Sequence, residues 1–160
     1  MADFNIAIVK TLASEGGEKV TDIAGDAGGL TKFGISQRAY PHLDIRSLSI
    51  DDAKLIYKRD YWDRLNCDLI ASQVIAESIF DFAVNAGVTT SAKLAQMCAG
   101  VNIDGRIGDN TIKAVDGLNV ELFLARFTIA KIARYAHICN KDRAQSKFLL
   151  GWINRSLGGV

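Results

Sequence analysis

Apolar residues recur at helical spacing along most of the chain, and they predict a mostly helical protein. Seven stretches have this pattern: 3–14, 49–62, 73–87, 90–99, 109–116, 120–139 and 142–157. The stretch 73–87 is apolar at nearly every position, which predicts a buried central helix. Since no alternating run is long enough for a core sheet, and no heptads or repeats occur, we expect an α-helical globule.

Local capping signals place the ends of several of these helices. Ser49, which two acidic residues follow closely, is a good N-cap, and Asp109 or Asn110 is expected to cap a short helix. Gly17 and Gly87 are placed to end the first helix and the central helix. Glycine suits these positions because it adopts the left-handed conformation that often terminates a helix.

One segment near the N-terminus departs from the helical pattern. Six of the 14 glycines fall between Gly16 and Gly34, which indicates irregular backbone with tight turns. Only short β-type fragments fit here, at 19–23 and 31–35. We therefore expect residues 18–35 to form a loop or a small hairpin lobe beside the helical body.

Ionisable side chains gather in this glycine-rich lobe. Glu15 closes an apolar helix, so its carboxyl is expected at the edge of the core, where burial favours the protonated form that a general acid needs. Asp26, set among glycines, is free to reach across a cleft as a base, and Asp22 is its rival. Thr31 offers a hydroxyl that can position an attacking water. Solvated surface acids beside turn glycines are the simpler explanation of this spacing alone.

The composition fits one globular domain, and its charge is unevenly distributed. The chain has 160 residues, 49% of them hydrophobic and 23% charged, with a formal net charge of +1. Residues 1–119 carry 12 Lys/Arg and 16 Asp/Glu, giving −4, whereas residues 120–160 carry 7 and 2, giving +5. The basic end either binds an anionic polymer or is the solvated face of terminal helices. No recognition motif supports nucleic acid, which we do not expect as a partner.

Cysteine and histidine usage argues against a metal site. Cys67, Cys98 and Cys139 are widely spaced among apolar residues, in no spacing typical of metal ligands. The two histidines, His42 and His137, are too few and too distant to complete a metal site. We therefore expect reduced thiols in the core, no metal and no cofactor.

Five short motifs follow one another along almost the whole chain. They are Glu15-Gly16-Gly17 with Asp26 to Ser36, Tyr61-Trp62, Phe80 to Gly87, Asp104 to Thr111, and Gly151-Trp152-Ile153-Asn154-Arg155. Together they resemble glycoside hydrolase family 108, the phage-type N-acetylmuramidases and secretion-activator proteins. The fourth motif is similar to an element of the family's C-terminal peptidoglycan-binding region, and the fifth is similar to its closing motif.

This resemblance implies a lysozyme-like helical fold and hydrolysis of the β-1,4 bond between N-acetylmuramic acid and N-acetylglucosamine, with Glu15 as the essential acid. It also implies a catalytic region, 1–87, and a helical peptidoglycan-binding-like region, 88–160, packed into one compact unit. The order Glu15, Asp26, Thr31 resembles that of phage lysozymes, although the spacings differ. The implied partner is the peptidoglycan glycan strand, bound by a monomer.

Several further residues are candidates for contact with the sugar. Asp81 and Asn85 share one face of the central helix with Glu77, at i, i+4 and i+8, and groups buried there without partners are costly. They either line the cleft or, as we favour, hydrogen-bond the glycine-rich lobe, with Asn85 the best placed to touch sugar. Tyr61 and Trp62 either stack on sugar rings or belong to the core.

The N-terminal segment has neither a signal-peptide pattern nor a long apolar run, so we expect no stable membrane insertion. The protein is then made in the cytoplasm and acts in the periplasm or cell wall after export or release, as an endolysin or a secretion-associated wall hydrolase. Two alternatives stay open. One is a lytic transglycosylase, and the other is a non-catalytic peptidoglycan-binding or secretion-assisting module.

Overall fold

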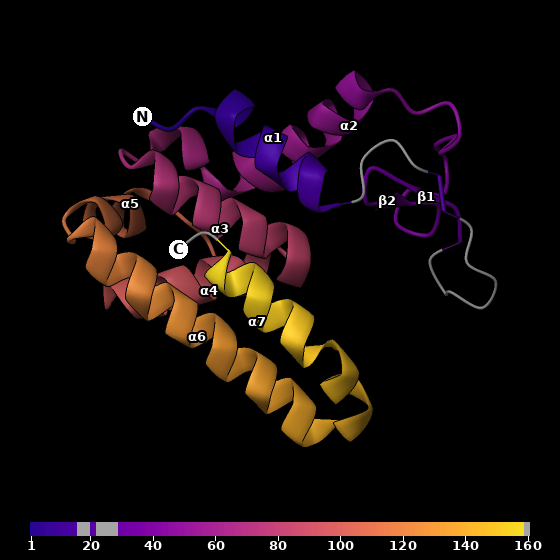
Figure 1. Ribbon diagram of the computed structural model, residues 1–160. Helices are drawn as coiled ribbons and strands as arrows, with labels where there is room; N and C mark the ends of the chain where they lie inside the picture. The colour runs from indigo at the N-terminus through magenta and orange to yellow at the C-terminus, as the bar shows by residue number, and fades with distance from the viewer. Residues whose placement is uncertain (16–19, 22–28, 159–160) are drawn as a thin grey trace.

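The described chain is mostly helical, with one small hairpin lobe beside the end of the first helix (Figure 1). The computed structural model describes residues 1–15, 20–21 and 29–158. The helices are α1 (Phe4–Ser14), α2 (Ile50–Tyr57), α3 (Gln73–Ala86), α4 (Val88–Ala99), α5 (Asp109–Asp116), α6 (Val120–Lys141) and α7 (Leu149–Leu157). The strands are β1 (Thr31–Lys32) and β2 (Ile35–Ser36). The expected fold class is therefore confirmed.

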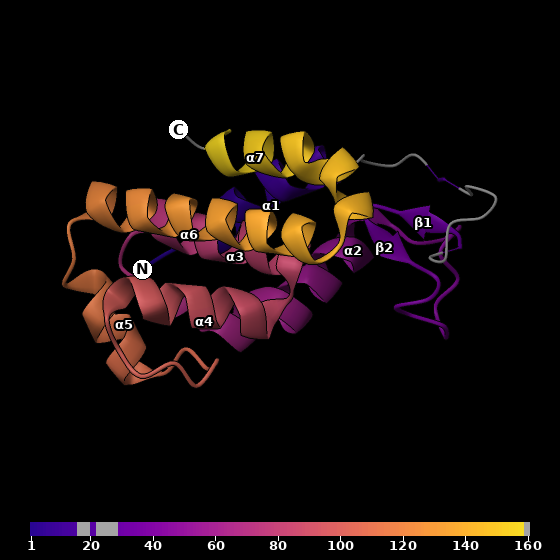
Figure 2. The same cartoon turned by 90° about the horizontal axis from the view of Figure 1, so that it is seen from below.

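Helix α3 lies at the centre of the helical body, with α1 and α2 on one side and α4 and α6 on the other (Figures 1 and 2). Its two faces carry different aromatic contacts. Phe80 meets the rings of Phe4 and Trp62, at centroid distances of 6.0 and 5.4 Å. Phe82 meets the rings of Phe127 and Tyr135, at 5.7 and 6.2 Å. Burial of Phe80 and Phe82 on two faces explains why most positions of this helix are apolar outside the polar stripe of Glu77, Asp81 and Asn85.

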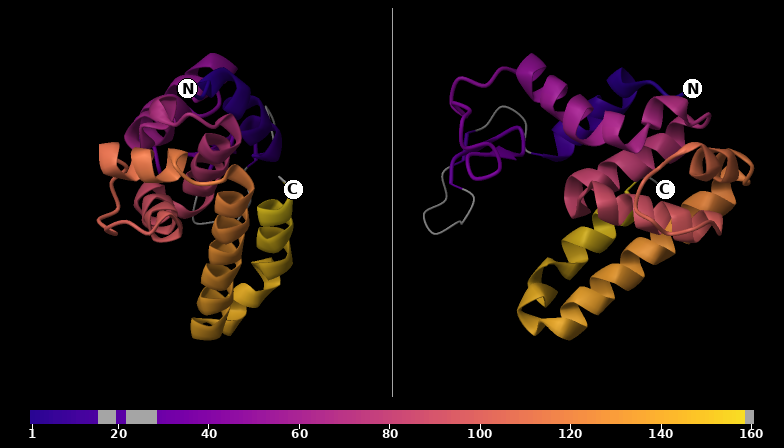
Figure 3. Two further views of the ribbon diagram at one scale, coloured as in Figure 1. Left: turned by 90° about the vertical axis from the view of Figure 1, so that its left-hand side faces the viewer. Right: turned by 180° about the vertical axis from the view of Figure 1, so that it is seen from behind.

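Helices α6 and α7 form an antiparallel pair that extends from the body (Figure 3). The sequence predicts one continuous helix over 142–157, but the structure has a 3₁₀ helix over Arg143–Phe148 before α7. The carboxylate of Asp142 accepts a hydrogen bond from the backbone N–H of Ala144 at 3.0 Å. This contact caps the start of the 3₁₀ helix, because the Asp142 side chain accepts from a backbone N–H that has no carbonyl partner in the first turn.

The capping predictions succeed at two helices and fail at a third. Ser49 and Asp52 form a capping box at the start of α2, and Gly87 ends α3 at a φ of 89°. Neither Asp109 nor Asn110 caps α5: its N-cap is Gly108, which offers no side chain. The prediction that Gly17 ends the first helix lies outside the described residues.

The second helix does not keep one geometry as far as residue 62. Its α-helical part ends at Tyr57, and the chain continues as a π-helix over Lys58–Trp62. The wider turn belongs to a segment in which Trp62 is fully buried and donates its indole N–H to Asp68 at 2.6 Å. A single π-helical turn of this kind shifts the side chains that follow it around the helix axis.

The hairpin lobe is built around a two-residue turn. Phe33 and Gly34 connect β1 to β2, and both have positive φ values, 53° and 75°. Two positive φ values define a type I′ turn, whose twist matches that of paired strands. The fragment expected at 31–35 is thus a real hairpin, extended by a bridge from Thr21 to Thr31.

The three cysteines agree with the sequence expectation of reduced core thiols. Cys67, Cys98 and Cys139 are all buried and free. Within the described ranges, no helix is both long enough and apolar enough to cross a membrane.

Candidate active site

Glu15 lies where α1 meets the hairpin lobe. It is the C-cap of α1, with its backbone N–H donating to the carbonyl of Thr11 at 3.0 Å. Its side chain is 20% exposed. The helix thus fixes the backbone while the carboxyl sits at the boundary between body and lobe, as the sequence predicts.

The tip of the hairpin packs directly against this carboxyl. A Cβ added to Gly34 would lie 2.7 Å from Oε2 of Glu15 and 2.6 Å from the hydroxyl of Tyr57. No side chain other than hydrogen fits there, and the positive φ independently favours glycine. Tyr57 donates to the carbonyl of Phe33 at 2.8 Å, so α2 holds the turn in place.

Arg155 joins Glu15 to the central helix. One guanidinium nitrogen, Nη1, donates to Oε1 of Glu15 at 2.8 Å, while Nη2 and Nε donate to the two oxygens of Asp81 at 2.8 and 3.2 Å. The Arg155 side chain is 25% exposed. Burial opposes its charge, but the contacts with Asp81 and Glu15 raise its pKa above the ordinary value. Arg155 is therefore a permanent cation shared by two carboxylates.

Two tyrosines complete the surroundings of Glu15. Burial raises the pKa of Tyr57, and the negative charge of Glu15 raises it further. The pKa of Tyr61 is raised by burial and then by Asp60 and Glu15. Both phenols therefore stay neutral at physiological pH and keep their hydroxyl protons as donors.

The other predicted catalytic residues are only partly placed. Thr31 lies in β1, half-buried, and its hydroxyl donates to the carbonyl of Gly29 at 3.4 Å. Asp26 and its rival Asp22 lie outside the described residues, so the choice between them as base stays a prediction.

The predicted sugar-contacting residues separate into two groups. Trp62 is 0% exposed and lies in the core, so the structure corrects the expectation that it stacks on sugar. Tyr61 is half-buried, with its ring 5.7 Å from that of Tyr57. Asn85 is also half-buried, and its amide donates to the hydroxyl of Tyr135 at 2.9 Å. Tyr61 and Asn85 thus stay candidates, and Trp62 does not.

The polar stripe on α3 forms a network, but with partners other than those expected. Glu77 pairs with Lys10 of α1 at 2.6 Å, Asp81 pairs with Arg155 of α7, and Asn85 bonds to α6. Within the described part of the chain, the stripe therefore ties helices together rather than holding the lobe. Among the described residues, Arg155 is the link between this stripe and Glu15.

Sequence reasoning missed Arg155, Gly34 and Tyr57 as parts of the site. Arg155 is 140 residues from Glu15, so no local pattern connects the two. The signal was the closing motif, which carries Arg155, and the first motif, which carries Gly34. Tyr57 gave no signal beyond its place on the second helix.

The turn at residues 104–111 has a structural explanation. The side-chain amide of Gln96, which is 1% exposed, donates to Asp104 at 2.7 Å and to the carbonyl of Arg106 at 2.9 Å. Gly105 has a φ of 81° and donates back to Gln96 at 2.8 Å. This network fixes the loop against α4. No group of three or more metal-ligating side chains occurs among the described residues.

Comparisons with known proteins identify the family. The Glycosyl hydrolase 108 family matches residues 8–87, half of the chain. The chain belongs to glycosyl hydrolase family 108. A second match, to the family described as "Predicted Peptidoglycan domain", covers residues 87–157 of this family 108 protein. The two matches meet at Gly87, the C-cap of α3. The protein therefore combines a glycoside hydrolase region with a peptidoglycan-associated one.

A solved structure shares the fold of this family 108 protein. It is that of SagA from Brucella abortus, with a TM-score of 0.75 and 23% sequence identity. The similarity covers 97% of this chain and 94% of SagA. No curated protein sequence matches the chain.

Proposed function

We propose that the protein is an endo-acting N-acetylmuramidase, which hydrolyses the β-1,4 bond between N-acetylmuramic acid and N-acetylglucosamine in peptidoglycan. The observation that carries this proposal is the setting of Glu15 in a family 108 chain. Its carboxyl is half-enclosed where the hairpin meets the helical body, with the backbone fixed by α1. In the reacting state the protonated carboxyl donates its proton to the glycosidic oxygen, which the departing sugar retains.

The groups around Glu15 support this role by positioning it. Arg155 holds one oxygen, and the Gly34 turn closes around the other, so the carboxyl has little freedom to rotate. A general acid gains rate from such fixed placement, since the proton is delivered along one direction. The neutral hydroxyl of Tyr61 is a donor available to a sugar nearby.

The second carboxylate that we propose is Asp26, which takes the proton of the attacking water while Thr31 orients that water. Carboxyls about 6.5–9.5 Å apart leave room for a water and give inversion, whereas about 5–5.5 Å gives a covalent intermediate and retention. We propose inversion. Asp26→Asn should abolish turnover and Asp22→Asn should leave most of it, and the opposite pattern would make Asp22 the base.

The decisive experiment replaces Glu15 by Gln, which keeps the size of the side chain and its acceptor for Arg155. We expect Glu15→Gln to fold with the melting temperature of the wild type and to lose at least about 10³-fold in clearing of purified peptidoglycan. The matched control is Asp109→Asn, an exposed acid of α5 at the end of the molecule opposite the hairpin (Figure 1). Wild-type clearing by folded Glu15→Gln would refute Glu15 as the catalytic acid, whereas no clearing by the wild type itself would favour a non-catalytic module.

Mass spectrometry of the released fragments separates hydrolysis from transglycosylation. Hydrolysis adds water and leaves reducing N-acetylmuramic acid ends, whereas a lytic transglycosylase uses the sugar's own hydroxyl and leaves 1,6-anhydro ends. We expect reducing ends. We also propose that the protein reaches the wall after export or release, which fractionation of the producing cells before and after lysis can test.

A further inference from the structure

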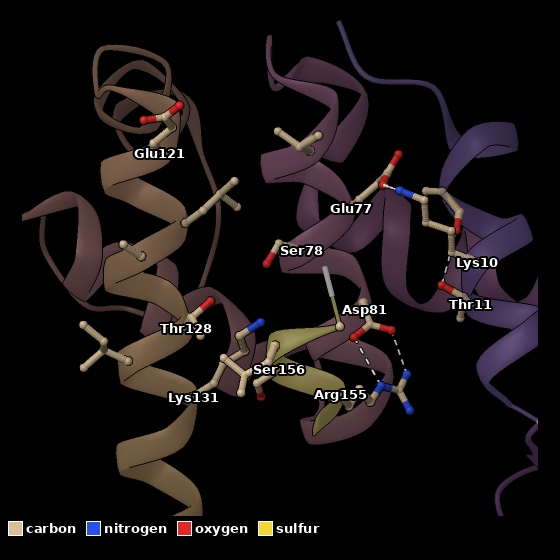
Figure 4. Close-up of a pocket in the computed structure, with 17 residues that line it drawn as sticks. Lys10, Thr11, Glu77, Ser78, Asp81, Glu121, Thr128, Lys131, Arg155 and Ser156 are labelled. Atoms are coloured by element: carbon tan, nitrogen blue, oxygen red, sulfur yellow. Dashed lines mark hydrogen bonds and ion pairs between the residues drawn. The ribbon is translucent and has the colours of Figure 1, made fainter. Parts of the chain in front are cut away.

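A second feature of the molecule, separate from Glu15, is a pocket of about 660 Å³ between α1, α3, α6 and α7 (Figure 4). Its size lies in the range of small-molecule sites, about 300–1,000 Å³. Glu15 does not line it, but Asp81 and Arg155 do, so the ion pair forms a wall between the pocket and the catalytic carboxyl. Six apolar residues share the remaining lining with polar ones such as Thr11, Ser78 and Thr128: Ala7, Val74, Leu124, Ala125, Ile129 and Leu157.

One charged side chain in this pocket, Lys131, makes no ion pair with any of the described residues. Lys131 of α6 is only 6% exposed, and its ammonium points into the pocket (Figure 4). Its one close contact is the ring of Phe127, with the ammonium 5.3 Å from the centroid. Among the described residues, Lys131 makes no hydrogen bond and no ion pair. Burial lowers its pKa, which reflects the cost of keeping this charge out of water.

The neighbouring charges are already balanced by other groups. Both oxygens of Asp81 are bound by Arg155, and Glu77 is bound by Lys10 at the rim. Glu121, the remaining acid of the lining, is exposed and sits ten residues before Lys131 on α6. At 1.5 Å per residue this separation is about 15 Å, so Glu121 is at the opposite end of the pocket (Figure 4).

We propose that this pocket is a binding site for a carboxylate carried on a short apolar chain. The carboxylate pairs with the ammonium of Lys131, and the chain lies along α6 beside Leu124 and Ile129 towards the far end. An anion there offsets the desolvation of Lys131, which the charge of Asp81 offsets only in part because Asp81 is paired with Arg155. The apolar side chains along α6 suit the apolar chain of the proposed ligand, and the ammonium of Lys131 suits its carboxylate.

Two sources supply this chemistry, namely a fatty acid and the free carboxyl end of a wall peptide. Calorimetric titration at pH 7 with octanoate tests the first, and titration with N-acetyl-D-alanyl-D-alanine tests the second. Each has an uncharged counterpart, octanol or the dipeptide amide. Tighter binding of octanoate or of the dipeptide identifies the source, and either result supports the site. In a series from hexanoate to decanoate, affinity should rise about fourfold per methylene until the pocket is full.

Lys131→Met removes the charge and keeps the aliphatic stem. We expect the carboxylates to bind this variant about 10- to 100-fold more weakly, while the uncharged counterparts bind as they do to the wild type. The melting temperature of ligand-free Lys131→Met should equal or exceed that of the wild type, because a buried unpaired charge is gone. The matched control is Lys141→Met, an exposed lysine of the same helix.

A second variant tests the space rather than the charge. Ala125→Phe adds a ring at an exposed position of the lining and leaves Lys131 intact. It should weaken the binding of all ligands alike. The proposal is overturned if neither carboxylate binds the wild type, if both uncharged counterparts bind as tightly as their carboxylates, or if folded Lys131→Met binds both carboxylates normally. No titration contains peptidoglycan, so the result is independent of cleavage at Glu15.

Discussion

At the residue scale, the candidate catalytic acid is defined by contacts with groups far from it in sequence. Gly34 and Arg155 fix the two oxygens of Glu15 from different elements, and Arg155 is held in turn by Asp81. A bidentate guanidinium contact has a fixed geometry, so the position of Asp81 on α3 is transmitted to Glu15. The site is therefore positioned by the ion pair that links Arg155 of α7 to Asp81 of α3.

Replacing Arg155 by Met tests this positioning role. Without the guanidinium, Glu15 and Asp81 are left as two close carboxylates with no shared cation. We expect kcat on soluble peptidoglycan fragments to fall about 10- to 100-fold with KM changed little, because the loss is of alignment rather than of sugar contacts. Arg155→Lys should recover only part of kcat, since an ammonium cannot contact both oxygens of Asp81 and also reach Glu15.

The matched control for this series is Arg143→Met, an exposed arginine in the segment that leads to α7. It should keep both kinetic constants of the wild type. If folded Arg155→Met kept its kcat and lost only KM, Arg155 would be a sugar-binding residue and not a positioning one.

Residue by residue, the sequence points to Glu15 as the candidate acid but not to the groups that fix it. Glu15 is recognisable because a helix end and a glycine-rich segment adjoin it in the chain. Arg155 is not, since its partner lies at the other end of the sequence and only packing brings them together. For Trp62 the sequence suggested a role that the structure excludes. An aromatic residue at a helix end can either stack on a sugar or lie in the core, and only its burial in the structure distinguishes the two.

At the element scale, the type I′ turn of the hairpin determines how closely the lobe approaches α1. Phe33 and Gly34 both have positive φ, and the hydroxyl of Tyr57 holds the turn from α2. At Gly34 the lobe thus approaches Glu15 with backbone atoms. A change of a single methyl group at the turn should alter the site.

Gly34→Ala is the variant that adds this methyl group. The left-handed backbone costs an alanine about 1–2 kcal/mol, and its Cβ would lie 2.7 Å from Oε2 of Glu15. We expect a lower free energy of unfolding in urea titrations, and a loss of peptidoglycan clearing at temperatures where the variant is fully folded.

Gly29→Ala is the matched control for the turn. Gly29 also has a positive φ, 66°, but among the described residues an added Cβ there would meet only Gln37, at 3.8 Å. It should lose similar stability and keep most of its activity. Equal losses of activity in the two variants would mean that the contact with Glu15 does not matter.

The elements themselves were largely predictable where one helix period continues without interruption. The central helix was expected over 73–87 and is observed over Gln73–Ala86. The failures are local changes of helix type, at Lys58–Trp62 and at Arg143–Phe148. Hydrophobic spacing near 3.6 residues does not distinguish a π or 3₁₀ turn inside a run, because these differ by only a fraction of a residue per turn.

At the scale of the whole molecule, the two family matches divide the chain at a point where the core does not divide. The boundary at Gly87 separates α3 from α4, but the hydroxyl of Ser91 in α4 donates to the carbonyl of Ile79 in α3 at 2.6 Å. Phe82 of α3 packs among rings of α6. Helix α3 is therefore shared by both regions, which supports the prediction that they form one compact unit.

A fragment of residues 1–87 tests this unity. Removing residues 88–160 exposes the face of α3 that carries Ile79, Phe82 and Ala83, each at most 1% exposed in the whole chain. Exposing a large apolar side chain costs about 1.5–3 kcal/mol, and a domain's total stability is about 5–15 kcal/mol. The fragment also lacks Arg155. We expect it to have no cooperative thermal transition, poor dispersion of its amide proton resonances, and no clearing of peptidoglycan.

The full chain prepared in parallel is the control, and adding residues 88–160 to the fragment asks whether the halves assemble. Because the interface is a core of interlocking aromatic rings, we expect restored activity to require both fragments together and to rise with their concentration. A folded, active 1–87 fragment would instead show that the hydrolase region is autonomous. The contact of Arg155 with Glu15 would then be dispensable for cleavage, and the Arg155→Met and fragment experiments would have to agree on that point.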